Sequence, residues 1–149
     1  MKYSIEVLID LPREEVIKKF KDPDNIVCWQ RGFISMKTLQ GNLGEEGSKN
    51  ELKLKIENRE IEMIETIIKN NLPQEFHASY TAKGLYNLQE NFFDETPAHK
   101  TRWITHNEFK FSGFMKLIGL FMPGAFRKQT QQTMEDFKAF AETGIKVKN

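Results

Sequence analysis

Two glutamates of this 149-residue chain, Glu65 and Glu90, have the side chains and the surroundings of an acid/base pair. Each stands in a segment where apolar and polar residues alternate, as they do in a half-buried strand. Burial among apolar neighbours raises the pKa of a carboxyl group, and a general base needs a pKa near the working pH. The other interpretation is that one or both glutamates lie on an outer face or bond a neighbouring backbone group. Both interpretations stay open, and no other residue is a catalytic candidate.

The remaining groups able to do chemistry fit structural roles. The histidines lack the spacing of metal ligands, so we expect no metal and no cofactor; they are His77, His99 and His106. Cys28 has no histidine near it in the sequence, so we interpret it as a small buried residue rather than a nucleophile. The glycine-rich stretch 41–47 precedes a predicted strand rather than a helix, and its Glu45 and Glu46 would repel phosphate. We therefore interpret it as a hairpin turn.

The charge and composition of the chain exclude several classes of protein. Its 22 Lys and Arg residues and 21 Asp and Glu residues leave a net charge of +1, so no strong overall field recruits nucleic acid or anionic lipid. A lone cysteine cannot form an internal disulfide, and Lys2, Glu6 and Asp10 interrupt the apolar run that a signal peptide needs. We therefore expect a cytoplasmic protein, whose oligomeric state stays open.

The most apolar segment of the chain is FSGFMKLIGLFMPGAF, residues 111–126. A membrane-spanning helix needs about 20 mostly apolar residues. Here Lys116 interrupts the run and Arg127 closes it after 16 residues. We therefore expect no stable insertion into a membrane, while peripheral contact with a membrane surface stays open.

Glycines and a proline inside this segment weaken helical order, which favours a mobile element over a plain core helix. We predict that residues 112–124 form a short, kinked helix or loop over a cavity mouth, ahead of a long C-terminal helix. Its apolar side chains would close the cavity; they are Phe114, Leu117, Ile118, Phe121 and Met122. The alternative is a fixed first turn of the long helix.

Period-two alternation dominates the first three-quarters of the chain and predicts antiparallel strands joined by short turns. The expected strands cover about residues 3–10, 33–41, 48–57, 60–69, 75–83, 85–94 and 100–111. Two short helices follow the first strand, one after Pro12 and one at about 24–30. A long amphipathic helix at about 124–143 ends at Gly144. The expected fold class is α+β, with a seven-stranded antiparallel sheet curled around the long helix.

We expect one domain over residues 1–149, with residues 145–149 as a loose tail. Within it, several groups of residues carry a resemblance to a known family. They are Pro12–Val16 with Phe20, Asp22 and Pro23 with Trp29, Ile64–Thr66 with Leu72, Pro73 and Phe76, and Thr101–Thr105. Their order and spacing resemble the START/SRPBCC helix-grip superfamily, which includes polyketide cyclase/dehydrase-like and birch-pollen-allergen-like proteins. The resemblance implies a helix-grip fold whose deep cavity binds hydrophobic small molecules, and catalysis in some members only.

The faces of the predicted strands indicate which side chains line such a cavity. On the seventh strand we expect the face of Trp103 to point inward, because charge-capable side chains gather on the other face. On the sixth strand we favour the face of Leu88 and Glu90 as inward, over the face of Asn87 and Phe93.

The fifth strand places Tyr80 inward and His77 outward, and the faces of 60–69 stay undecided. The predicted ligand-binding residues are Tyr80, Leu88, Phe92, Trp103, Thr105, Asn107, Phe109, Leu117, Phe121, Met122 and Phe126.

Three functions compete on these residues. The first is binding or transport of a hydrophobic or amphipathic small molecule, with Tyr80, Thr105 and Asn107 as the few orienting polar groups. The second is a cyclase/dehydratase-like enzyme acting on a carbonyl-bearing polycyclic or lipid-like substrate, with Glu65 or Glu90 as base. A weaker third is a protein-interaction module of the chaperone-activator kind. We favour binding of an apolar small molecule, without nucleic acid as a partner; the sequence does not identify the ligand.

Overall fold

The computed structural model of the protein describes residues 1–148. Its strands are β1 (Lys2–Ile9), β2 (Phe33–Gln40), β3 (Lys49–Ile56), β4 (Arg59–Asn71), β5 (Glu75–Ala82), β6 (Leu85–Glu95) and β7 (Thr101–Phe111). Its helices are α1 (Arg13–Lys21), the 3-10 turn η1 (Pro23–Asn25), α2 (Ile26–Trp29), α3 (Met115–Phe121) and α4 (Pro123–Thr143). The predicted order of elements and the α+β fold class are confirmed.

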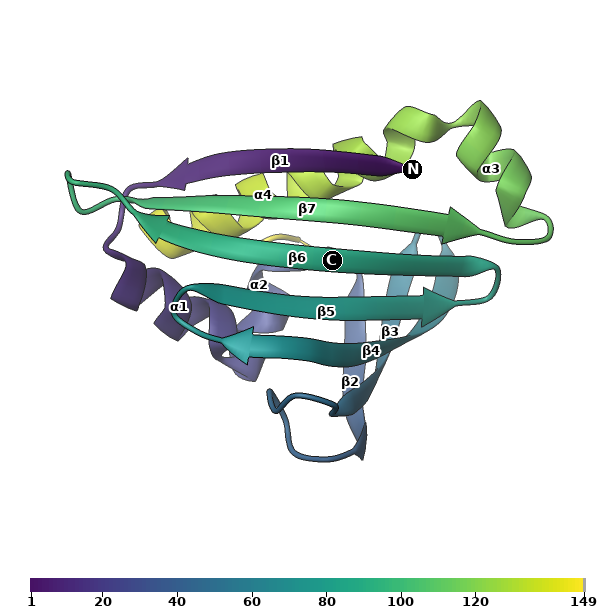
Figure 1. Ribbon diagram of the computed structural model, residues 1–149, viewed down its shortest axis with the longest axis horizontal. Helices are drawn as coiled ribbons and strands as arrows, with labels where there is room; N and C mark the ends of the chain where they lie inside the picture. The colour runs from purple at the N-terminus through teal and green to yellow at the C-terminus, as the bar shows by residue number, and fades with distance from the viewer. Residues whose placement is uncertain (149) are drawn as a thin grey trace.

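The strands of the described chain form a seven-stranded antiparallel sheet in the order β1-β7-β6-β5-β4-β3-β2. The sheet is curved, and α1, α2 and α4 lie behind it on the same side in Figure 1. That side is the inner face, and the opposite side is the outer face. Side chains alternate between the two faces along each strand, so the strand register decides which groups meet.

The hydrophobic core lies where α1 and α4 pack on the inner face near β1, β6 and β7. The aromatic ring of Phe20 is its centre, with edge-on contacts to Phe93, Trp103 and Phe137 at centroid distances of 5.0, 5.7 and 6.0 Å. Met134, Phe137 and Ala141 of α4 are buried, at 1%, 0% and 2% exposure. Phe126, one of the predicted ligand-binding residues, is half-buried.

Local sequence explains where the helices begin and end. Pro123 is at the first turn of α4, where a missing N–H costs nothing, and Gly144 ends the helix in the left-handed conformation at φ 76°. Asp22 ends α1, and its side chain accepts a hydrogen bond from the N–H of Asp24 at 3.0 Å. The predicted helix at 24–30 is therefore two pieces, η1 and α2.

The predicted loose tail, 145–149, includes Asn149, which lies outside the described residues. Within the tail, the N–H of Val147 donates to the carbonyl of Cys28 at 2.9 Å. The looseness of the tail stays a prediction.

Candidate functional site

A row of polar side chains crosses the inner face of the sheet. Strand register places Asn50 of β3 opposite Glu65 of β4, Glu65 opposite Tyr80 of β5, and Tyr80 opposite Asn87 of β6. Directly opposed residues of antiparallel strands share one face, so all of these side chains point to the same side. We call Asn50, Glu65, Tyr80 and Asn87 the inner polar row.

Glu65 is the acidic member of the inner polar row. Its Oε1 accepts a hydrogen bond from Asn50 Nδ2 at 3.1 Å, and Tyr80 bonds the same carboxyl group. Burial raises the pKa of Glu65, although both hydrogen bonds act to lower it. Burial and the nearby Glu65 also raise the pKa of Tyr80 well above its ordinary value. The site therefore holds a carboxyl group biased toward its protonated form, beside a hydroxyl that stays protonated.

A cluster of amides continues from the row toward β7. It comprises four amide side chains and the hydroxyl of Thr105, and we call it the amide cluster. The amides are Asn87, Gln89, Asn91 and Asn107. Asn107 is its hub, because its Oδ1 accepts from Asn87 at 3.2 Å and its Nδ2 donates to Thr105 Oγ1 at 3.1 Å. Trp103 joins the cluster by donating its Nε1 proton to Asn91 Oδ1 at 2.9 Å. Mutual hydrogen bonds let these polar groups stay buried.

The β1 end of this face is closed by the first turns of α4. The hydroxyl of Tyr3 donates to the carbonyl of Phe126 at 3.1 Å and lies 2.7 Å from Thr130 Oγ1. Phe126 in turn packs on Phe109 and Phe111, with ring centroids 4.9 and 5.3 Å apart. These contacts hold α4 against β1 and β7, beside the amide cluster.

Several predicted site residues lie where the sequence placed them, on the inner face. Trp103, Thr105, Asn107 and Phe109 are buried at 4%, 1%, 3% and 8% exposure. Tyr80 is half-buried there. Whether these side chains contact a ligand stays a prediction.

The predicted inward face of β6 is wrong, so Leu88, Glu90 and Phe92 do not line the inner face. Register pairs Phe93 with Trp103, and Phe93 is fully buried, stacked on that indole at 5.7 Å. The inward face of β6 is therefore the one with three amide side chains, Asn87, Gln89 and Asn91. Their bonds to one another offset the cost of burial, and a residue-by-residue reading of hydrophobicity misses this.

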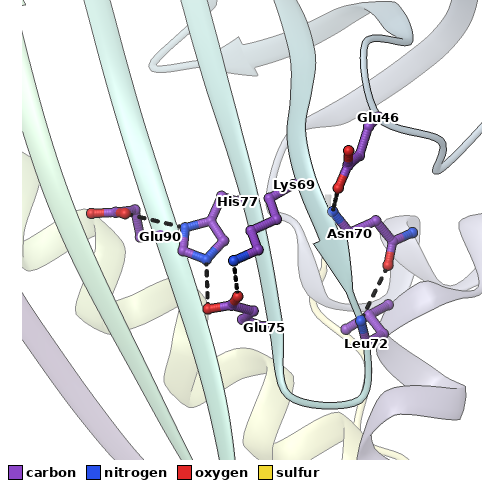
Figure 2. Close-up of polar contacts among 7 residues, drawn as sticks. All are labelled: Glu46, Lys69, Asn70, Leu72, Glu75, His77 and Glu90. Carbon is purple, nitrogen blue, oxygen red and sulfur yellow. Dashed lines mark hydrogen bonds and ion pairs between the residues drawn. The ribbon is translucent and has the colours of Figure 1, made fainter.

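Glu90 instead belongs to an ion-pair chain on the outer face, shown in Figure 2. His77 lies between two carboxylates, with Nε2 3.2 Å from Glu75 Oε2 and Nδ1 3.3 Å from Glu90 Oε2. Lys69 also contacts Glu75, and hydrogen bonds from Lys69 and His77 lower the pKa of that carboxyl. Glu65 and Glu90 thus lie on opposite faces and cannot act as a pair.

His77 is outward as predicted, yet it is 6% exposed because Phe92 packs against its ring at 5.1 Å.

The residues expected to close a cavity from segment 112–124 also differ. The short helix ahead of the long one is confirmed as α3, but Leu117, Phe121 and Met122 are 47%, 74% and 54% exposed. The reason is Gly119, where an added Cβ would come within 2.7 Å of the Phe111 ring. Helix α3 therefore rests on β7 at Gly119, with Met115 and Ile118 half-buried, and its other bulky apolar side chains point to solvent.

The sequence analysis missed Asn50, Asn87, Gln89 and Asn91 as inner-face groups. A signal was present, because Asn87, Gln89 and Asn91 repeat with the period of two that marks one strand face. Within the described part of the chain, two hollows of about 350 Å³ lie elsewhere. One is on the outer face beside Glu90 and His106, and the other is between Arg31 and the chain end. An enclosed hollow beside Thr105 and Asn107 stays a prediction.

Known proteins resemble this chain in three-dimensional structure and not in sequence. No protein-family model matches the sequence, and a search of curated proteins finds no match. Solved structures do match. The Zhui aromatase/cyclase from Streptomyces sp. R1128 has a TM-score of 0.78 over 95% of this chain and 93% of its own, at 10% identity. Ara h 8.0201 has a TM-score of 0.77 over 95% and 97%, at 11% identity. A conserved protein from Geobacillus kaustophilus has 0.74 over 95% of each chain, at 16% identity.

The chain has the helix-grip fold. The resemblance expected from the sequence is thereby confirmed in architecture. Identities of 10% to 16% carry the fold alone, so they leave the ligand and any reaction to the residues of the site. Within residues 1–148, none of the helices is both long enough and apolar enough to cross a bilayer.

Proposed function

We propose that the protein binds an amphipathic small molecule between the inner face of the sheet and α4, with the polar end of the ligand at the inner polar row. The observation that supports the proposal most is the partial burial of Glu65 and Tyr80 on the inner face. Burial raises the pKa of both groups, yet both are only half-buried, so each keeps surface that a small molecule can reach. A recessed polar group with accessible surface is what orients a ligand in an otherwise apolar site.

The chemistry of the row selects the kind of ligand. A protonated Glu65 and the hydroxyl of Tyr80 can each donate to an oxygen, and the amide of Asn87 offers both a donor and an acceptor. A hydroxyl or carbonyl group on the ligand satisfies such partners, whereas a pure hydrocarbon leaves them unbonded. Apolar neighbours on the same face, Leu52 and Met63, would contact the rest of the molecule.

Native mass spectrometry of the purified full chain tests the binding proposal. We expect a co-purified small molecule, or binding of an added fatty alcohol as a probe, which the double variant Glu65→Gln with Tyr80→Phe weakens about tenfold. One lost hydrogen bond to a ligand is worth roughly that factor. Glu90→Gln on the outer face is the matched control and should bind like the wild type. Equal binding by all forms, or none by the wild type, would contradict the proposal.

A second candidate is a cyclase/dehydratase-like enzyme, favoured by the raised pKa of Glu65 alone. In its ionised form Glu65 would remove a proton from carbon next to a substrate carbonyl. The hydroxyl of Tyr80 would then donate to the developing oxyanion. Under this candidate, Glu65→Gln abolishes turnover of a polyketide-like substrate while leaving its dissociation constant within about threefold, because Gln keeps the size and polarity. Unchanged turnover in this variant would exclude Glu65 as the base.

A further inference from the structure

Helix α3 and its flanking residues expose an unusual group of large apolar side chains. They are Phe114 at 75% exposure, Leu117 at 47%, Leu120 at 71%, Phe121 at 74% and Met122 at 54%, and we call them the α3 patch. Figure 1 shows α3 standing at one end of the sheet, beside the N-terminus of β1 and ahead of α4. A contiguous exposed apolar group of this kind marks a surface that binds something.

Packing on the other side of α3 holds the patch outward. Gly119 lies against the Phe111 ring, and an added Cβ at Gly84 would come within 2.9 Å of the Met115 side chain. Met115 and Ile118 are half-buried, so the helix already presents an apolar side to the sheet. Turning the patch inward would require Phe or Leu to occupy the space that Gly119 leaves open. The exposure is therefore a built feature of the surface.

The charged residues that flank the patch along the chain have one sign. Residues 109–134 contain four basic residues and no acidic one, although the whole chain has 21 Asp and Glu residues and a net charge of only +1. The basic residues are Lys110, Lys116, Arg127 and Lys128, all exposed. Two of them contact aromatic rings, with Lys110 over Tyr86 and Arg127 over Tyr3, each at 5.9 Å. A chain of balanced charge thus contains one segment, residues 109–134, that is basic and apolar.

We propose that the α3 patch docks on the surface of an anionic lipid bilayer. Its Phe, Leu and Met side chains enter the boundary between headgroups and acyl chains, and the basic residues contact lipid phosphates and carboxylates. Aromatic side chains favour this depth of a membrane. A second copy of the chain is a poorer occupant, because two patches rimmed by basic residues repel each other. The inference concerns the surface alone and stands whether or not the inner face holds a ligand.

Co-sedimentation of the full chain with phosphatidylcholine vesicles, with and without phosphatidylserine, tests the inference. We expect binding that requires phosphatidylserine and weakens as salt rises. Phe114→Ser with Phe121→Ser should reduce the bound fraction about tenfold or more, and Lys116→Glu with Lys128→Glu should reduce it about as much. The matched controls are Leu39→Ser with Leu43→Ser for apolar exposure and Lys18→Glu with Lys21→Glu for charge. Circular dichroism checks that each variant keeps its fold.

Three outcomes would overturn the inference. One is a wild-type chain that stays in the supernatant with phosphatidylserine vesicles at low salt. Another is equal loss of binding in the control variants, which would show non-specific adhesion. The last is a dimer in sedimentation equilibrium that Phe114→Ser with Phe121→Ser separates, which would assign the patch to a second copy.

Discussion

A glutamate carboxyl has a raised pKa on the inner face of the sheet and a lowered pKa on the outer face. On the inner face, Glu65 has Asn50 and Tyr80 as neutral partners, and burial raises its pKa. On the outer face, Glu75 lies beside Lys69 and His77, and its pKa is lowered. Both carboxyls lie on adjacent strands of one sheet. Their difference comes from the burial of Glu65 and from the Lys69 cation beside Glu75.

The comparison separates a structural role from a functional one. Glu75 of β5 pairs with Lys69 of β4, so it links the two strands. The hydrogen-bond partners of the Glu65 carboxyl, Asn50 and Tyr80, are neutral, and burying a carboxyl beside neutral partners is costly for stability unless something else uses it. The inner face is therefore where we place ligand chemistry, and the outer face is where we place strand cohesion.

The largest effect should come from the core of the inner face. Phe137 is fully buried, so Phe137→Ala should lower the free energy of unfolding by about 3–5 kcal/mol. Phe92 on the outer face is half-buried, and Phe92→Ala should cost less than about half as much. Urea unfolding of the two variants gives both numbers. Equal losses would mean that the outer face carries as much packing as the inner one.

The next effect tests whether the inner amides depend on one another. Asn107→Leu removes the oxygen that accepts from Asn87 and Gln89, and it removes the amide that donates to Thr105. We therefore expect the free energy of unfolding to fall by about 1–3 kcal/mol. The neighbouring Glu108 lies on the outer face, and Glu108→Gln should change stability by less than about 0.5 kcal/mol. Chemical denaturation measures both. A stabilised Asn107→Leu variant would show that the cluster is dispensable for folding.

A smaller effect should depend on pH through Glu65. Its folded pKa is raised, so the stability it contributes is present below the unfolded pKa and is lost as pH rises through the folded pKa. The side chain introduced by Glu65→Gln cannot ionise. As pH rises through the folded pKa of Glu65, the free energy of unfolding of this variant should therefore increase relative to that of the wild type by on the order of 1 kcal/mol. Unfolding at a series of pH values measures the gain. Carboxyl-detected NMR should find Glu65 titrating above an ordinary glutamate; an ordinary value would remove both the gain and the acid/base candidate.

The smallest effect should have the opposite sign, at Glu75. Its folded pKa is lowered, so its stabilising contribution is present above the unfolded pKa and is lost as pH falls through the folded pKa. Glu75→Gln should therefore be slightly less stable than the wild type near neutral pH and equal to it in acid. Solvent and salt screen such surface pairs, so the difference should shrink in high salt. A difference that grows in acid would contradict a lowered pKa for Glu75.

The sequence alone determined the elements and their order. Period-two alternation located every strand to within about two residues of its observed ends, and Gly144 marked the end of the last helix. These signals are local, because alternation, proline and glycine act on the backbone of their own segment. The inward face of the seventh strand was also readable, since charged side chains gather on its other side.

Tertiary structure alone decided what the site contains. The sixth strand buried its amides because Asn87 and Asn91 found partners on other strands, and no local pattern reports those partners. Glu65 and Glu90 were alike in sequence and became opposite in role, since register faces one toward Tyr80 and the other toward His77. Helix α3 leaves Leu120 and Phe121 exposed because Gly119, rather than a larger residue, lies against Phe111. In each case, the cost of burying a group depends on a partner distant in sequence, which folding alone supplies.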